Sequence, residues 1–337
     1  MRSILRSMDV ATVSFVSGPP GIRTVADELG IEHQAPGPAL FAESGQIKVM
    51  RTIYYNLKNY RSFLMRSAAV RNHILSSDYK FAIIDFEPIA ARAIRDTGLR
   101  ALVFDSQTLS CVPRSSLGLD RSVSDCAFRA VTKLCYGRLL KTAGSILTQS
   151  LIPCRGADSR QEIIPPCIPT RLAGVGPVAG NHVFCYSSIT SFPLALIALA
   201  RRHPQTEFRI YGNFAGDTRS VPENVIARPH GHEAFADDIA SSRLVYTYAG
   251  FQTIALAVLL GKPLVVCPIG KQWEQVFNTR VVRNFKLGRV LSRLSIGEME
   301  EALGHDRQAP VEVREWIESG KILIPEIIRA RVRDMVN

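Results

Sequence analysis

The sequence has no pair of cysteines in C-x-x-C spacing, although seven cysteines occur among its 337 residues. An odd number without that spacing is typical of reduced thiols and argues against a disulfide framework or a zinc site. Long apolar runs are also missing, because a run such as "SFPLALIALA" is shorter than the roughly 20 residues that span a bilayer. At the N-terminus Asp9 interrupts the apolar residues, and 10–16 fits a strand better than a signal peptide. These absences predict a cytoplasmic protein.

Acidic residues are missing between Lys48 and Ser77, in a chain whose formal net charge is +11. Basic residues in this stretch alternate with apolar and aromatic ones at helical spacing, which predicts a basic amphipathic helix over 48–71. A solvated helix face and contact with an anionic membrane surface both fit this pattern, and the second would place the protein peripherally at the inner face of the plasma membrane. Nucleic acid is not expected as a partner, because no recognition motif accompanies the charge.

Two nucleotide-binding motifs, G-x-G-x-x-G and G-x-x-x-x-G-K-[ST], are absent, which argues against a dinucleotide enzyme or an NTPase. What is present is an alternation of short apolar strands and helices in each half, for example "KFAIID" and "ALVFDS" in the first and "HVFCYSS" and "PLVVCPI" in the second. Such βαβ series predict an α/β fold with two Rossmann-like domains that face each other across a cleft. The expected boundaries are an acceptor-side domain at 1–150, a linker rich in Pro and Gly at 151–180, a nucleotide-sugar-binding domain at 181–315 and a helical tail at 316–337.

Two junctions between a strand and a helix in the second half have the chemistry of a phosphate site. In "CYSSITS", Ser187 and Ser188 precede a helix, and at 249–250 an Ala-Gly turn precedes a helix that should start near Gln252 and Thr253. Free backbone N–H groups and the helix dipole favour a diphosphate at such a place. Simple N-capping is the alternative for the serines, but two such junctions at one edge of a sheet favour a phosphate site.

The stretch 249–279 resembles the nucleotide-sugar site of GT-B glycosyltransferases, in particular the group related to the glycosyltransferase family 28 C-terminal domain. The shared order is a glycine turn, a threonine at the helix start, a G-x-P stop, an apolar strand that ends in proline and a polar cluster. Here these are Gly250, Thr253, Gly261-Lys262-Pro263, Cys267-Pro268 and "QWEQVFNT". The resemblance implies that Gly250 and Thr253 approach a diphosphate, that Glu274 and Gln275 bind sugar hydroxyls and that Asn278 braces the loop.

The nucleotide base is expected against the backbone near 228–232. The candidate donor-binding residues are, together, Ser187, Ser188, His230, Gly250, Phe251, Gln252, Thr253, Gln272, Glu274, Gln275 and Asn278. The likeness extends to "IIDFEP" and "VFDSQ" in the first half, where Asp85, Glu87 and Asp105 lie at or just beyond strand ends. Asp85 and Glu87 are candidates to orient an acceptor hydroxyl or take its proton, and capping of the helix at Pro88 is the alternative for Glu87.

Three departures from the family pattern bear on activity. Leu256 stands where the family has an acidic residue for the ribose, and Gln107-Thr108 lacks a histidine that usually follows the glutamine. The opening strand with its G-x-G-H loop has no counterpart, and a start placed too late at an internal Met is the favoured explanation.

The resemblance implies an inverting transferase that needs no metal or other cofactor, with a UDP-sugar as donor and an unidentified, membrane-held acceptor. A catalytically impaired relic that binds sugar nucleotides and a non-hydrolysing UDP-sugar epimerase are the alternatives.

Overall fold

The structure is a computed structural model that describes residues 15–17, 32–34, 37–43, 46–120, 122–137, 139–169, 172, 174–187, 191–212 and 221–336. The strand expected at 10–16 lies only partly within these residues. In the part of the chain that the structure describes, no helix is both long enough and apolar enough to cross a membrane.

The C-terminal half is built on a six-stranded sheet in which the strands pair in parallel, in the order β11-β10-β9-β12-β13-β14. The chain therefore starts in the middle of the sheet, builds out to one edge and crosses back to build the other, which is a doubly wound topology. The strands are β9 (Val183–Ser187), β10 (Phe208–Gly212), β11 (Val225–Arg228), β12 (Leu244–Tyr248), β13 (Leu264–Cys267) and β14 (Arg289–Val290). The helices are α10 (Ser191–Arg202), α11 (Phe235–Ala240), α12 (Phe251–Leu259), α13 (Trp273–Asn284) and α14 (Ile296–Ala302).

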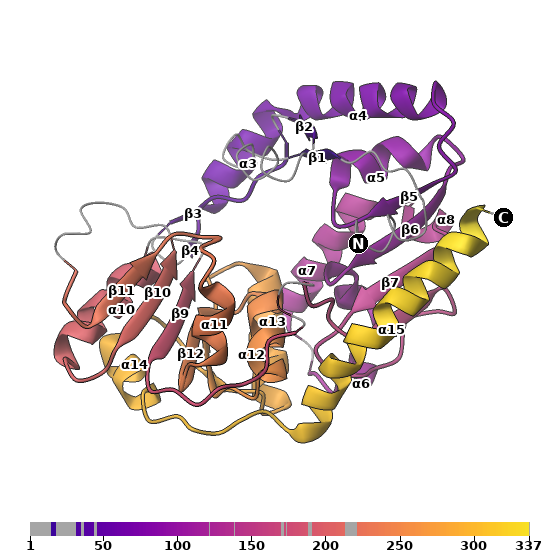
Figure 1. Ribbon diagram of the computed structural model, residues 1–337. Coiled ribbons are helices and arrows are strands. Elements are labelled where there is room, and N and C mark those ends of the chain that lie inside the picture. Colours follow the sequence, from indigo (N-terminus) through magenta and orange to yellow (C-terminus); the bar gives the residue numbers. More distant parts are fainter. Residues whose placement is uncertain are drawn as a thin grey trace.

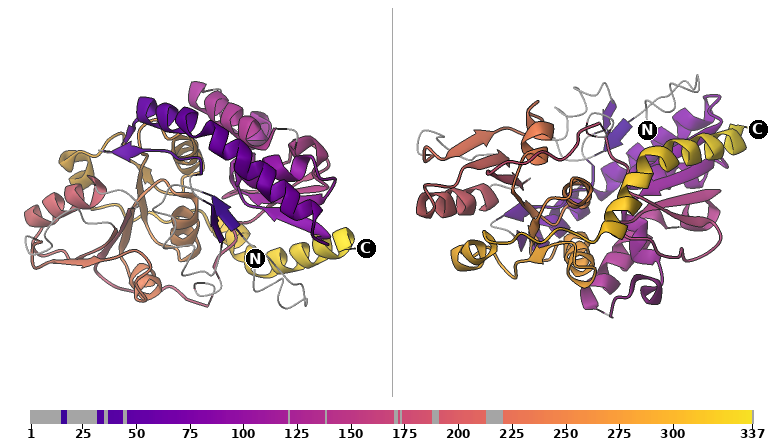
Figure 2. Two further views of the ribbon diagram at one scale, coloured as in Figure 1. Left: turned by 90° about the horizontal axis from the view of Figure 1, so that it is seen from above. Right: turned by 60° about the horizontal axis from the view of Figure 1, so that its bottom comes forward.

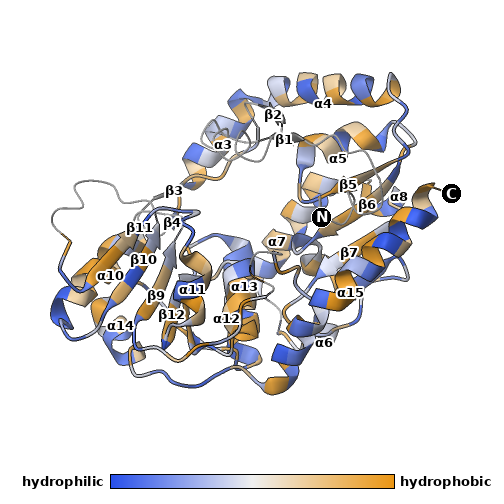
Figure 3. Cartoon of the chain, viewed as in Figure 1, coloured by the Kyte–Doolittle hydropathy of each residue, from blue (hydrophilic) through white to orange (hydrophobic). Residues whose placement is uncertain are grey.

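Helix α12 shows why this half is so regular. All of its residues except Gln252 are buried, and Figure 3 colours it hydrophobic along most of its length. A helix that is apolar on every side packs inside a protein rather than on its surface. Strand β12 beside it is buried along its whole length, as expected of a strand covered on both faces of a parallel sheet.

The N-terminal half has a four-stranded parallel sheet in the order β5-β6-β7-β8. Its strands are β5 (Phe81–Ile84), β6 (Arg100–Asp105), β7 (Ser145–Gln149) and β8 (Gln161–Ile164). Its helical segments are α5 (Pro88–Arg95), η2 (Gln107–Cys111), α6 (Arg114–Leu117), α7 (Val123–Tyr136) and α8 (Leu139–Thr142). Strands β1 (Phe15–Ser17) and β2 (Glu32–Gln34) form a separate parallel pair.

The predicted boundaries need two corrections. Strand β8 lies within the segment expected to be a linker, yet it pairs with β7, so the N-terminal sheet extends to Ile164. The C-terminal helix α15 (Val311–Val336) begins five residues before the expected tail and returns to the N-terminal half (Figure 1). There Ile324, Ile328 and Val332 pack against the apolar face of β6 and β7. An apolar face covered by a segment distant in sequence could not be assigned from local composition.

The basic stretch forms two helices instead of one. Helix α3 (Val49–Lys58) ends and α4 (Tyr60–Leu75) begins at Asn59, whose side chain donates to the Tyr55 carbonyl oxygen at 2.8 Å. The two helices form an arm above the rest of the molecule (Figures 1 and 2). The hairpin of β3 (Ala42–Glu43) and β4 (Gln46–Ile47) carries this arm to the C-terminal half, where the Ile47 amide donates to the Gly270 carbonyl oxygen.

The two halves share one apolar core between α7 and α13. Phe128 on α7 and Phe277 on α13 belong to the same buried cluster, with their ring centroids 5.8 Å apart. At the edge of this contact, Arg280 of α13 forms an ion pair with the buried Asp125 of α7. The halves are therefore joined by packed side chains as well as by the chain connection.

Candidate functional site

The polar loops of the two halves meet at an interdomain junction, which is formed by residues 85–87 and 105–108 of the N-terminal half and 270–275 of the C-terminal half. The Gln107 side-chain amide donates a long hydrogen bond of 3.4 Å to the Glu274 carboxylate. Residues 85–87 follow the parallel strand β5, residues 105–108 begin with the last residue of β6, and residues 270–275 follow β13. The junction therefore lies at the carboxyl ends of parallel strands in both sheets, where α/β proteins bind their ligands.

The polar cluster at 272–278 mostly braces its own loops. The Gln272 side chain caps α13 by accepting from the Gln275 amide, and the Gln275 side-chain oxygen accepts from the Ile269 amide at 2.9 Å. The buried Asn278 donates to the Ala249 carbonyl oxygen at 3.0 Å, which ties α13 to the turn before α12. Glu274 is the member of the cluster whose carboxylate reaches the N-terminal half.

Backbone strain is concentrated at the same place. Lys271 has a φ of 64°, in the left-handed region that residues other than glycine rarely adopt, and Phe86 across the junction has a φ of 40°. Such conformations persist only where the surrounding structure holds them, and they are frequent at binding and catalytic sites. Both loops of the junction are thus fixed in shape rather than relaxed.

The turn at 249–250 precedes α12, close to where the sequence predicted a helix start. Gly250 is the N-cap residue of α12, which starts at Phe251, slightly before the expected position. Thr253 is nearly buried and Gln252 is exposed. Ser187 is buried at the end of β9, and Ser188 lies outside the described residues. Leu256 packs in the core cluster at 4% exposure, so this position offers no polar group to a ribose.

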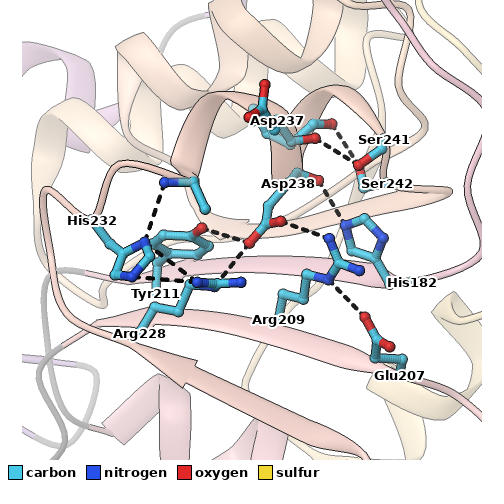
Figure 4. A network of polar contacts seen from close by, with 12 residues as sticks. His182, Glu207, Arg209, Tyr211, Arg228, His232, Asp237, Asp238, Ser241 and Ser242 are labelled. Atoms are coloured by element: carbon cyan, nitrogen blue, oxygen red, sulfur yellow. Dashed lines mark hydrogen bonds and ion pairs between the residues drawn. The ribbon is translucent and has the colours of Figure 1, made fainter.

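The loop at 228–232, where the nucleotide base is expected, is held by an ion-pair network around the buried Asp238 (Figure 4). The Asp238 carboxylate accepts hydrogen bonds from Arg209 and from the Tyr211 hydroxyl, both at 2.6 Å, and forms an ion pair with Arg228 at 3.0 Å. Arg228 in turn lies 3.3 Å from the ring of His232. The network fixes both ends of the turn from Arg228 to His232.

His230 lies within that turn and meets Tyr186 edge-on, with ring centroids 5.5 Å apart. Partial burial lowers the pKa of His230 below its ordinary value, which favours the neutral ring.

On the N-terminal side, the two predicted carboxylates have different environments. Glu87 is buried at the start of α5 and accepts a hydrogen bond from the Ala90 amide, so it occupies the capping role that was its alternative. Burial raises the pKa of Glu87 to about 7. Asp85 is exposed as a whole residue, but protein atoms close to its carboxylate raise its pKa to about 6, through desolvation first and then through the negative charges of Asp105 and Glu274.

Two residues of the junction and one that contacts it were missed as site residues by sequence reasoning. Gln107 was noted only for the histidine that does not follow it, Tyr136 lies 50 positions from the turn that it contacts, and Lys271 looked like an ordinary loop residue. Asp105, noted without a role, is completely buried, and burial raises its pKa. Among the described residues, no group of three His, Cys, Asp or Glu side chains is arranged as metal ligands would be.

Comparison with known proteins identifies the kind of protein that carries these two sheets and their junction. The model of the family described as glycosyl transferase family 1 matches residues 3–304. The chain belongs to glycosyl transferase family 1. No curated protein matches the chain in sequence. The prediction of a GT-B glycosyltransferase enzyme is thus confirmed, and the epimerase alternative is set aside.

Solved glycosyltransferases share the fold of this family 1 glycosyltransferase over nearly its whole length. SnogD from Streptomyces nogalater has a TM-score of 0.56 at 14% identity, covering 99% of this chain and 93% of that chain. SsfS6 from Streptomyces sp. SF2575, complexed with thymidine diphosphate, has a TM-score of 0.58 at 13% identity, covering 98% and 94%. Arabidopsis thaliana UGT89C1, complexed with UDP, has a TM-score of 0.63 at 13% identity, covering 100% and 95%. These similarities confirm the predicted pair of Rossmann-like domains.

Proposed function

We propose that this glycosyltransferase moves a sugar from a UDP-sugar, bound by the C-terminal half, to an acceptor hydroxyl presented by the N-terminal half, with Asp85 as the base. The observation that carries the proposal is the convergence of Asp85 and Glu274, one from each half, at the junction that Gln107 bridges. Nucleoside diphosphates are the ligands named for two proteins of the same fold, SsfS6 and UGT89C1.

Asp85 is the better candidate for the base. It is exposed, whereas the Glu87 carboxylate is engaged in capping α5. A raised pKa of about 6 makes Asp85 a stronger proton acceptor than an ordinary aspartate while leaving it mostly ionised at neutral pH. In the proposed step the acceptor oxygen bonds to the anomeric carbon and its proton goes to Asp85. The bond from that carbon to the diphosphate breaks, and the configuration inverts.

Glu274 and Gln107 are assigned to hydroxyl groups of the donor sugar. The Gln107 side-chain oxygen is buried and has no hydrogen-bond partner among the described residues, so it can accept from a bound hydroxyl. A carboxylate next to an amide matches the donors and acceptors that a sugar ring presents. Gly250 and Thr253, with the start of α12, are assigned to the diphosphate, whose charge the helix N-terminus favours.

Calorimetry with UDP, thymidine diphosphate and common UDP-sugars tests the donor assignment. Glu274→Gln should weaken a UDP-sugar by about 10-fold, since hydrogen bonds to charged groups contribute about 1.5–3 kcal/mol, and leave UDP itself unchanged. Glu326→Gln, an exposed glutamate on α15, is the matched control. Absence of binding to all of these ligands at millimolar concentration would overturn the proposal, and binding without transfer to any acceptor would indicate the impaired relic.

The arm supports an acceptor held at a membrane. Met50, Ile53, Tyr54 and Leu57 lie at helical spacing on one face of α3 and are 47% to 77% exposed. The opposite face of α3 contacts residues 39–41, whose backbone forms hydrogen bonds with the side chains of Thr52 and Asn56. The basic residues around the apolar face fit an anionic bilayer, to which each adds about 1 kcal/mol near the surface.

Vesicle flotation tests this part of the proposal. The protein should float with vesicles that contain phosphatidylglycerol and not with neutral phosphatidylcholine vesicles, and the double variant Met50→Ser, Leu57→Ser should lose most of the binding. Ile322→Ser with Leu323→Ser, which removes two exposed apolar side chains from α15, is the matched control. Equal binding of both double variants, or no binding to anionic vesicles, would overturn the membrane assignment.

A further inference from the structure

Asp105 lies at the end of β6 with no exposed surface, and hydrogen-bond donors point at both of its carboxylate oxygens. Oδ1 accepts from the Thr108 amide at 2.9 Å and from the Thr108 hydroxyl at 2.8 Å, and Oδ2 accepts from the Tyr136 hydroxyl. Donors on both oxygens stabilise the charged form against the desolvation that burial imposes. The site therefore holds a buried carboxylate that is fully occupied by protein groups and does not itself reach a ligand.

A chain of hydrogen bonds leads from Gln161 through Thr148 and Thr108 to Asp105, and each group donates to the next. The Gln161 side-chain amide on β8 donates to the Thr148 hydroxyl on β7 at 2.8 Å, and the two threonine hydroxyls are 2.7 Å apart. Because the Thr108 hydroxyl donates to Asp105, it accepts from Thr148. Three strands and η2 are thus linked to one carboxylate, which makes Asp105 a rigid point of the sheet edge.

Tyr136 carries this rigidity to the turn that holds Asp85. Its hydroxyl, while donating to Asp105, accepts from the Phe86 amide at 2.8 Å. The Phe86 ring packs edge-on against the Tyr136 ring, with centroids 5.6 Å apart. Phe86 has the left-handed φ of 40°, which is strained in a residue other than glycine and needs a fixed partner to persist. Tyr136 supplies that partner through both its hydroxyl and its ring.

We propose that Asp105 and Tyr136 are positioning residues that hold the strained turn at Phe86 and thereby aim Asp85 into the interdomain junction. The inference rests on the proposed role of Asp85 as the base. A base must lie within hydrogen-bond distance of the acceptor oxygen, and a displacement of about 1 Å can cost 100-fold in rate. The strain at Phe86 is retained because the relaxed turn would point Asp85 elsewhere.

Tyr136→Phe tests the proposal, because it removes the hydroxyl and keeps the ring. We expect faster hydrogen exchange at the Phe86 amide, a fall of about 10- to 100-fold in kcat and unchanged affinity for UDP. The acid limb of the pH profile should also shift downward, because a loosened Asp85 is better solvated and titrates closer to an ordinary aspartate. Tyr246→Phe is the matched control, since that buried hydroxyl donates to the Met299 carbonyl oxygen within the C-terminal half.

A second variant separates positioning from general loss of stability. Thr148→Val removes the hydroxyl that donates to Thr108 but leaves the link from Tyr136 to Phe86 intact, so it should lower the melting temperature with less than a 3-fold effect on kcat. Unchanged Phe86 exchange and unchanged kcat in Tyr136→Phe would overturn the positioning role, as would equal losses of kcat in Tyr136→Phe and Tyr246→Phe. Failure of the unaltered protein to bind UDP would instead count against the proposed function, because Phe86 exchange is measured without any substrate.

Discussion

The two halves of this glycosyltransferase place polar groups at the same edge of their sheets, but they hold them by different means. In the C-terminal half the loops are braced by amide side chains that bond backbone atoms, as Gln275 does at Ile269 and Asn278 at Ala249. In the N-terminal half, side-chain carboxylates and hydroxyls bond each other around the buried Asp105. Amide bracing fixes a shape without introducing charge, whereas a carboxylate network fixes a shape and also changes the pKa values nearby.

This difference fits the proposed division of labour between the halves. A half that binds a diphosphate through backbone N–H groups and a helix dipole gains from rigid, uncharged loops. A half that accepts a proton gains from an environment that raises the pKa of its base: desolvation first, and then the negative charges of Asp105 and Glu274, raise the pKa of Asp85 to about 6. The comparison predicts that N-terminal variants change rate and pH dependence, whereas C-terminal variants change affinity.

The largest effect is expected from Asp85→Asn. Loss of a general base typically costs about 10²–10⁴-fold in rate, and UDP binding should be unaffected because the proposed UDP site lies in the C-terminal half. For the unaltered enzyme, kcat/KM should rise with pH through about 6, since Asp85 accepts a proton only when it is ionised, and the variant should lose this dependence.

The control for Asp85→Asn is Asp78→Asn, in an exposed aspartate that pairs with Lys80 just before β5. It should leave both rate and pH profile unchanged. If Asp85→Asn retained full activity while UDP binding persisted, Asp85 would not be the base, and Glu87, the other candidate in the turn, would be the next residue to replace.

The pH dependence of stability offers the second test, at Glu87. Its pKa is raised from 4.5 to about 7, so between these values the folded protein binds more protons than the unfolded chain. The stability contributed by the protonated form is therefore present below about pH 4.5 and is lost as pH rises through 7. At about 1.4 kcal/mol for each pKa unit, the loss is at most about 3 kcal/mol.

Glu87→Gln should remove this dependence, because glutamine keeps a side-chain oxygen for the Ala90 amide and carries no charge. Urea unfolding at each pH gives the difference in free energy of unfolding between the variant and the unaltered protein. From pH 5 to pH 8 this difference should change by about 1–3 kcal/mol in favour of the variant. Glu326→Gln on the exposed face of α15 provides the control. A constant difference between the Glu87 variant and the parent across this pH range would show that Glu87 is ionised in the folded protein throughout.

Much of the C-terminal half could be predicted because its signals are local. The order of glycine turn, apolar helix, G-x-P stop and apolar strand indicated α12 and β13. The sequence pattern could not show which side-chain amide oxygens would accept hydrogen bonds from backbone N–H groups. The sugar contact implied for Gln275 stays a prediction, and its side-chain oxygen already bonds the Ile269 amide.

The N-terminal half was harder to predict because its decisive contacts are distant in sequence. Gln107 meets Glu274 across 167 positions, and Tyr136 meets Phe86 across 50. The break at Asn59 has neither proline nor glycine to signal it, and β8 lies in a segment whose prolines and glycines indicated a linker. Composition reports what a segment favours alone, and each of these features depends on what the segment packs against.

The smallest effect, and the sharpest test of the C-terminal side of the comparison, is expected from Asn278→Ala. This change removes the hydrogen bond that joins α13 to the turn at Ala249. It should therefore loosen both loops of the proposed donor site, 270–275 for the sugar and 249–250 for the diphosphate. A hydrogen bond contributes about 0.5–1.5 kcal/mol, which predicts that UDP and UDP-sugar both bind about 2- to 10-fold more weakly, with kcat at saturating donor nearly unchanged. Asn284→Ala is the matched control, because that residue lies on the same helix and donates to the Gly118 carbonyl oxygen away from the donor loops. Calorimetry with both ligands and kcat at saturating donor are measured on both variants. Weaker binding of the UDP-sugar alone would make Asn278 a sugar contact instead of a brace. A loss of kcat with intact binding would show that the two halves do not divide binding from chemistry.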